Sequence, residues 1–246
     1  MRLVRPALGK TYDRENKAFR DIGRRFSAVR DAQVLCETLD GLNETARGSG
    51  GGESLAIVRD WAEARRKPVL RDRDLDELVA RTRTDLATAR LRIDAWKLDG
   101  DPREALAGGL AKTYRRARKR YGDIAPGSPP ELFHEWRKRV KYHWYHCRLL
   151  RRAWPDGMKP RIAALNELGG VLGAEHDLSV LRQVLRAEAV GGVPGPDLAV
   201  VDDLAASSGR DLRAEALEKA PPLFVETPKA LTRRIVGTWG VAQEAG

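Results

Sequence analysis

One stretch of the chain concentrates hydrogen-bond donors at helical spacing. Residues 131–154 read ELFHEWRKRVKYHWYHCRLLRRAW. Donors recur there every three or four residues, which places them on one face of a helix. The members of this ladder are His134, Arg137, Lys138, Lys141, Tyr145, Arg148 and Arg152. At about 1.5 Å per residue the ladder is about 27 Å long, so it favours a run of regularly spaced anionic groups over a single one.

The same segment carries an apolar stripe on its other side. The stripe predicts a helix with one face in the core and one face lined by cations. Its members are Leu132, Trp136, Val140, Trp144, Cys147, Leu150 and Trp154.

The positive charge of the chain is gathered around this segment. The 246 residues include 45 Lys+Arg and 35 Asp+Glu, a net charge of +10. Between Leu110 and Arg161 there are fifteen basic and four acidic residues, a net charge of +11. Like charges packed this densely repel one another unless an anion neutralises them, so we expect an anion site as well as a solvated surface. On charge density alone, Arg115, Arg116 and Lys119 are added to the candidate binding residues.

Composition excludes several classes of protein. Cys36 and Cys147 form no CxxC pair, which argues against a zinc ribbon or a disulfide scaffold and fits the cytoplasm. The sequence has no run of 18 apolar residues and no signal-peptide pattern at its start, so no membrane contact is expected. The length suits one large domain or two small ones.

Apolar spacing is helical along almost the whole chain, as in Phe19, Ile22, Phe26 and Val29. Breakers separate these segments, including the stretches 48–52, 100–102, 126–130, 154–160, 191–196 and 221–228. The sequence therefore predicts an all-α fold of about nine helices and no sheet.

An internal repeat with an offset of 146 residues divides the chain. Residues 22–35 align without gaps on residues 168–181, with five identities: Gly23/Gly169, Ala28/Ala174, Asp31/Asp177, Val34/Val180 and Leu35/Leu181. We expect one domain over 1–246, built from two pseudo-symmetric bundles at 1–100 and 101–246. Asp31 and Asp177 are predicted to cap the second helix of a sharp corner, with Arg30 and His176 beside them.

The same offset places Met1 opposite Cys147, so residues 1–5 match only the tail of the ladder helix. The first bundle is therefore expected to lack its N-terminal helix, and the natural chain to begin upstream of Met1.

Together these motifs resemble the CHAD domain, the conserved histidine α-helical domain. His134-x-x-Arg137-x-x-x-Lys141-x-x-x-Tyr145 is followed by the Leu-Gly-x-x-x-Asp-x-x-Val-Leu element at 172–181, and residues 30–34 resemble the RDxxV motif of the family's first repeat. The resemblance implies two helical bundles related by pseudo-two-fold symmetry, with inorganic polyphosphate bound in a basic central cleft. It places His134, Arg137, Lys141 and Tyr145 at that cleft, and Arg30 and His176 at the corners.

The sequence leaves three other chemistries open. His143 and His146 could share a metal, but no third ligand or carboxylate accompanies them. RNA binding by the same basic surface is the main alternative, although the tryptophans fall on the apolar stripe. Metal-dependent processing of polyphosphate or triphosphate, with a separate partner, is another. The sequence holds no GxxxxGK[ST], GxSxG or HExxH motif, and no ExExK strand of the triphosphatase domain often fused to this family.

The prediction is non-catalytic binding of inorganic polyphosphate, with no cofactor. Arg137→Ala and Lys141→Ala should weaken binding, and Arg139→Ala, which is off the ladder, should matter less. The resemblance adds polyphosphate granules in the cytoplasm as the place of binding. The sequence makes no prediction of oligomeric state.

Overall fold

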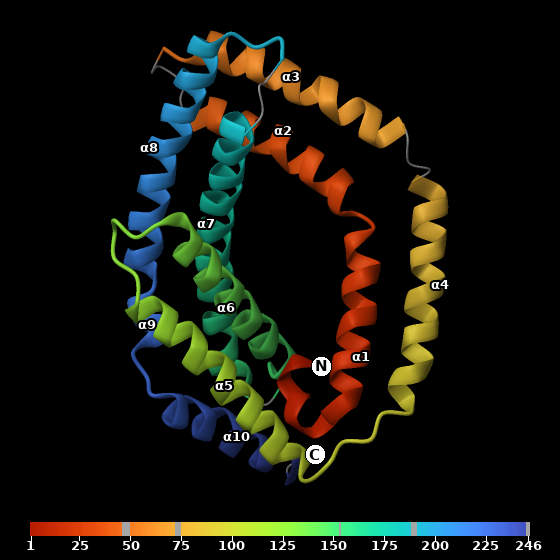
Figure 1. The fold of residues 1–246 in the computed structure, drawn as a ribbon. Helices are drawn as coiled ribbons and strands as arrows, with labels where there is room; N and C mark the ends of the chain where they lie inside the picture. The colour runs from red at the N-terminus through yellow and green to blue at the C-terminus, as the bar shows by residue number, and fades with distance from the viewer. Residues whose placement is uncertain (46–49, 72–74, 153, 188–190, 245–246) are drawn as a thin grey trace. The chain divides into compact units, whose positions relative to one another are not determined.

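A computed structural model describes residues 1–45, 50–71, 75–152, 154–187 and 191–244, and these residues are helical with no strand (Figure 1). The all-α prediction is confirmed. Ten α-helices and one 3-10 helix lie in the described ranges, against about nine helices expected. In chain order they are η1 (Arg2–Val4), α1 (Arg5–Arg24), α2 (Ser27–Thr45), α3 (Gly52–Arg71), α4 (Leu75–Asp94), α5 (Pro102–Gly122), α6 (Pro130–Leu149), α7 (Pro155–Ala187), α8 (Gly195–Lys219), α9 (Pro221–Phe224) and α10 (Pro228–Glu244).

Proline marks the start of half of these helices. It suits the first helical position, because the N–H it lacks would have no partner there. The five cases are Pro102, Pro130, Pro155, Pro221 and Pro228. Asp101 also caps α5 by accepting a hydrogen bond from the backbone N–H of Arg103 at 2.8 Å. The break predicted over 154–160 is too long, since Pro160 lies inside α7, where a proline removes one backbone hydrogen bond without ending the helix.

The chain forms two compact units. The first comprises Met1–Tyr12, Lys97–His176 and Leu212–Gly246, and the second Asp13–Trp96 and Asp177–Asp211. These units cut across the predicted halves 1–100 and 101–246, because the first twelve residues pack with α5 while 177–211 group with the earlier helices. The 146-residue repeat stays a prediction.

The core of the first unit forms around α5 and α6, which contact each other. α5 also contacts η1, α9 and α10. Phe224 of α9 brings an aromatic ring between the two central helices, 5.5 Å from the ring of Tyr121 and 6.2 Å from that of Trp136. Buried aromatic pairs at such distances add to the free energy gained by burying their area. This packing fixes the rotation of α6, and with it the direction of its polar face.

The predicted apolar stripe of α6 is correct in part. Trp136, Val140 and Cys147 are fully buried, and Leu150 nearly so. The predicted members at the edges of the stripe are only partly buried: Leu132, Trp144 and Trp154. Phe133 and His143 are buried in their place, so the core face is rotated slightly from the predicted one.

The second unit packs α2 against α3. The facing side chains are buried: Cys36, Leu39 and Leu42 on α2, and Leu55, Val58 and Ala62 on α3. α1 and α4 are joined by an ion pair between the buried carboxylate of Glu15 and Arg92, at 2.9 Å.

The capping roles predicted for Asp31 and Asp177 are wrong. The chain does turn between α1 and α2, at residues 25–26, but Asp31 lies inside α2. Asp177 lies well inside α7, which has no break there. Glycines weaken a helix by only about 1 kcal/mol each, and the burial of Leu168 and Leu172 on either side of Gly169 offsets that cost.

Candidate anion-binding site

The ladder occupies the face of α6 that points away from the core. His134, Arg137, Lys138 and Lys141 are half-buried, whereas Tyr145 and Arg148 are exposed. Arg152 is exposed in the turn after the helix. The opposite face carries Phe133, Trp136 and Val140 in the core, so packing directs the row of donors away from that core. Tyr145 and Arg148 reach solvent, whereas His134 and Arg137 lie against α7.

The structure brings two predicted histidines together from different helices. The rings of His134 on α6 and His176 on α7 lie 4.1 Å apart between centroids. Burial lowers the pKa of His134, and the neighbouring cations Lys138 and Arg137 lower it further. His134 is therefore neutral near pH 7, and its Nδ1 is buried with no hydrogen-bond partner among the described residues.

Arg137 is held beside the same helix pair. Its guanidinium lies close to Gly173 of α7, 3.8 Å from where a Cβ would stand. Within the described residues no carboxylate pairs with Arg137, and its Nε is buried without a partner. Unpaired buried donors are rare in folded proteins, and each one calls for an acceptor such as a water or an anion. Arg137 is the cation of the ladder best prepared for an anionic ligand.

Glu135 neutralises part of the charge on α6. Its carboxylate accepts a hydrogen bond from Lys138 at 2.6 Å and one from Arg139 at 3.3 Å. The bond from Lys138 is the main reason that the pKa of Glu135 is lowered. Lys138 is thus a weaker candidate than the sequence suggested.

The buried end of α6 carries a polar network that does not suit catalysis. The Cys147 sulfur lies 3.6 Å from Nε2 of His143, and Arg161 approaches the same nitrogen at 3.1 Å. Burial raises the pKa of the Cys147 thiol to about 11, and burial also keeps His143 neutral. A reactive cysteine needs a low thiol pKa and access to substrate, so this pair is a structural contact. No cluster of three potential metal ligands occurs in the described part of the chain.

The remaining predicted residues belong to other helices. Arg115, Arg116 and Lys119 are exposed on α5, and Arg30 is exposed on α2 in the second unit. The structure therefore brings His134, Arg137 and His176 together at the α6–α7 contact.

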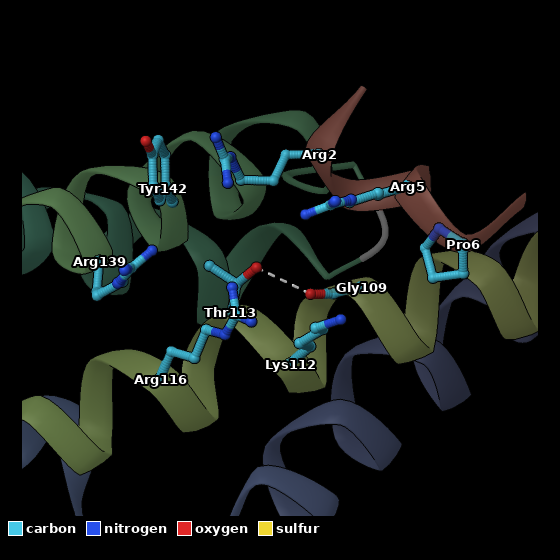
Figure 2. A pocket seen from close by; sticks show the side chains of 9 residues that line it. All are labelled: Arg2, Arg5, Pro6, Gly109, Lys112, Thr113, Arg116, Arg139 and Tyr142. Carbon is cyan, nitrogen blue, oxygen red and sulfur yellow. Dashed lines mark hydrogen bonds between the residues drawn. The ribbon is translucent and has the colours of Figure 1, made fainter. Parts of the chain in front are cut away.

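A cationic pocket that the sequence did not predict lies between the N-terminal segment, α5 and α6 (Figure 2). It is lined by side chains from the N-terminal segment, α5 and α6: Arg2, Arg5, Pro6, Gly109, Lys112, Thr113, Arg116, Arg139 and Tyr142. Only Arg116 among these was a candidate. The usable signal in the sequence was the excess of basic residues around Lys112, but Arg2 and Arg5 are distant in sequence and carried no local signal.

The geometry defines an all-helical protein with a cationic helix face. The sequence profile of the CHAD domain matches residues 1–186, about three quarters of the chain. The chain belongs to the CHAD domain family, which confirms the resemblance seen in its motifs. Comparisons with curated proteins and with solved structures returned no match. In the described ranges, none of the helices is long and apolar enough to cross a membrane.

Proposed function

We propose that this protein binds inorganic polyphosphate along the ladder face of α6 without hydrolysing it. The observation that carries the proposal is Arg137, a half-buried cation with no carboxylate partner among the described residues and with an unpaired buried Nε. It stands in the middle of a row of donors that the buried face of α6 directs outward. Membership in the CHAD family supports phosphate chains as the ligand.

Regular spacing is what matches the ladder to a polymer. Successive donors three or four residues apart are separated by about 4.5–6 Å along the helix. A phosphate chain offers an anionic group at every unit, so several cations can engage one molecule at once. Each engaged phosphate releases counterions, by analogy with nucleic acids, and affinity should fall steeply with log salt.

RNA is the second candidate because one aromatic ring is exposed on the ladder. Tyr145 is 48% exposed and packs against Trp144 at 4.8 Å between ring centroids. A base could stack on this ring. The other aromatic groups of α6 offer less, since Trp136 is buried and the guanidinium of Arg148 covers Trp144 at 4.6 Å. A single exposed ring offers a stacking position for only one base, so the ladder suits polyphosphate better than a single-stranded nucleic acid.

The carboxylates near the ladder argue for binding without turnover. Phosphoryl transfer usually relies on metal ions held by carboxylates beside the phosphates. Glu135 is engaged by Lys138 and Arg139, and the buried Glu175 is held by Arg213 at 2.8 Å. Both carboxylates are thus already engaged by basic side chains, which disfavours a metal ion on either of them.

The test is a calorimetric titration with polyphosphate of defined length. Arg137→Ala and Lys141→Ala should each weaken binding by about 1–3 kcal/mol, the scale of a charge-assisted hydrogen bond. The matched control is Arg233→Ala, an exposed arginine on α10 of the same unit. Equal losses of affinity in all three variants would mean that diffuse positive charge, and not an ordered site, binds the polyphosphate. That result would overturn the proposal.

Tyr145 separates the two candidate ligands. Tyr145→Phe keeps the ring but removes the hydroxyl donor, so it should weaken polyphosphate binding and leave base stacking intact. Tyr145→Ala removes both. If only the alanine variant loses affinity, and RNA competes equally with polyphosphate of the same charge, the protein binds nucleic acid.

A further inference from the structure

Glu135 is an acidic residue set into the cationic side of α6. Its side chain is 34% exposed, and its two carboxylate oxygens contact different cations. Oε1 accepts a hydrogen bond from Nζ of Lys138 at 2.6 Å, and Oε2 accepts one from Arg139 at 3.3 Å. The bond from Lys138 lowers the pKa of Glu135, so the carboxylate is charged near pH 7. In the free protein, one internal anion therefore neutralises part of the charge of two cations.

Helix geometry places Glu135 at the edge of the ladder. Each residue of a helix turns by about 100°, so Lys138 lies about 60° from Glu135 on the ladder side, and Arg139 lies about 40° from it on the other side. Arg139 lines the cationic pocket together with Tyr142 (Figure 2). The carboxylate of Glu135 is thus beside the position that a phosphate group would take on Lys138.

A carboxylate and a phosphate group make the same kind of contact with a lysine, a charge-assisted hydrogen bond to an anionic oxygen. Lys138 has further N–H groups, but a phosphate that shared its ammonium with Glu135 would lie beside a second negative charge. The pair of Lys138 and Glu135 is also open to water, since Lys138 is 41% exposed. Ion pairs at such exposure are weak, so a phosphate group can replace the carboxylate.

The neighbouring ladder residues favour this replacement for a chain. Arg137 and Lys141 stand before and after Lys138 on the ladder. A phosphate chain bound to these two residues presents its intervening groups to Lys138 at a high effective concentration. Once released, the carboxylate of Glu135 keeps Arg139 as its partner, so its charge is not left without a cation.

We propose that Glu135 is an internal competitor of the phosphate chain, which occupies Lys138 in the free protein and leaves it when a phosphate group binds there. This role depends on polyphosphate binding by the ladder, the function proposed above. It makes Glu135 a residue that limits the affinity of the ladder, and it makes Arg139 the residue that holds the displaced carboxylate.

The test is a calorimetric titration of Glu135→Gln, which removes the charge and keeps the shape of the side chain. Its affinity for polyphosphate of about a hundred units should rise by about two- to fivefold, the scale of a part-exposed ion pair. The matched control is Glu131→Gln, one turn earlier on α6, because Glu131 is exposed and forms no ion pair within the described residues. Both variants change the net charge equally, so the control should gain less. Loss of folding cannot produce a gain of affinity.

Two further measurements separate competition from a general effect of charge. In a Lys138→Ala background, Glu135→Gln should gain no more affinity than Glu131→Gln, because the contested ammonium is absent. In the wild type, Glu135 and not a solution anion neutralises Lys138, so a phosphate that binds there releases no ion from the lysine. The fall of log affinity with log salt should therefore be steeper by about 1 in Glu135→Gln, by analogy with nucleic acids.

Three results would overturn this role of Glu135. They are equal affinities of Glu135→Gln and Glu131→Gln, a gain of Glu135→Gln that persists in Lys138→Ala, and a loss of affinity in Glu135→Gln. Each of them leaves polyphosphate binding by the ladder intact, because it is measured on a protein that binds the chain. A wild-type protein that does not bind polyphosphate would contradict both proposals.

Discussion

Gly109 is the position at which the contact between η1 and α5 can be tested through the backbone. Real Cβ atoms essentially never lie within 3.0 Å of another heavy atom, but a Cβ at residue 109 would lie 1.6 Å from the Leu3 carbonyl oxygen. Gly109→Ala must therefore move η1 away from α5 by at least about 1.4 Å. No rotation of a side chain can relieve this contact, because the obstacle is backbone.

The neighbouring glycine provides the control. Gly108 is exposed on the same turn of α5, and a Cβ there would meet nothing within 4 Å. Alanine is favoured over glycine inside a helix by about 1 kcal/mol, and both variants gain this amount. Overpacking of a core contact costs about 1–3 kcal/mol. The free energy of unfolding of Gly109→Ala should thus be lower than that of Gly108→Ala by about 1–3 kcal/mol.

Denaturant titration checks this reasoning, because it gives the difference in stability between the two variants. Equal stability of Gly109→Ala and Gly108→Ala would refute the contact between η1 and α5.

Three other substitutions should act through single groups. Tyr114→Phe removes the hydroxyl that bonds to the carbonyls of Leu223 and Glu226 at 3.2 and 3.0 Å, so denaturation should show a loss of about 1 kcal/mol with tripolyphosphate binding unchanged. The hydrogen bond from Arg92 lowers the pKa of Glu15 below its ordinary 4.5, so wild-type stability should fall as pH drops below that value, and Glu15→Gln should flatten this part of a stability–pH profile. Burial lowers the pKa of His134 below its ordinary 6.5 in the free protein, and a bound anion raises this pKa. Polyphosphate affinity should therefore increase as pH falls below about 6.5. If the affinity of His134→Gln rises with falling pH as much as that of the wild type, His134 does not have this role.

The helices and the ladder were accessible to sequence reasoning because both are local. Prolines and a capping aspartate mark helix starts within a few residues, and spacing on one helix decides which donors share a face. The all-α fold followed from these signals, as did the outward direction of Arg137 and Tyr145 on α6. The contact between His134 and His176 was approached only through the family motif, which named both residues without pairing them.

The pocket and the division into units were not accessible in this way because they depend on long-range packing. Arg2 meets Lys112 only because Leu3 packs against Gly109, and no local pattern encodes such an approach. The N-cap prediction for the aspartates of the repeat fails for a related reason. Aspartate is a common N-cap residue, but the buried leucines before Asp177 keep α7 continuous. Arg139, chosen from the sequence as an off-ladder control, instead lines the pocket and is better replaced by Arg233.

The most direct test of the central claim compares phosphate chains of different length on the wild-type protein. The ligands are polyphosphate of about a hundred units, tripolyphosphate and orthophosphate. Calorimetry with each of them, repeated at rising salt, shows whether the ladder binds a long phosphate chain more tightly than a short one. We predict the tightest binding for the long chain, a linear fall of log affinity with log salt, and no release of phosphate during the titration. Binding of the long chain no tighter than that of orthophosphate at moderate salt would contradict the account.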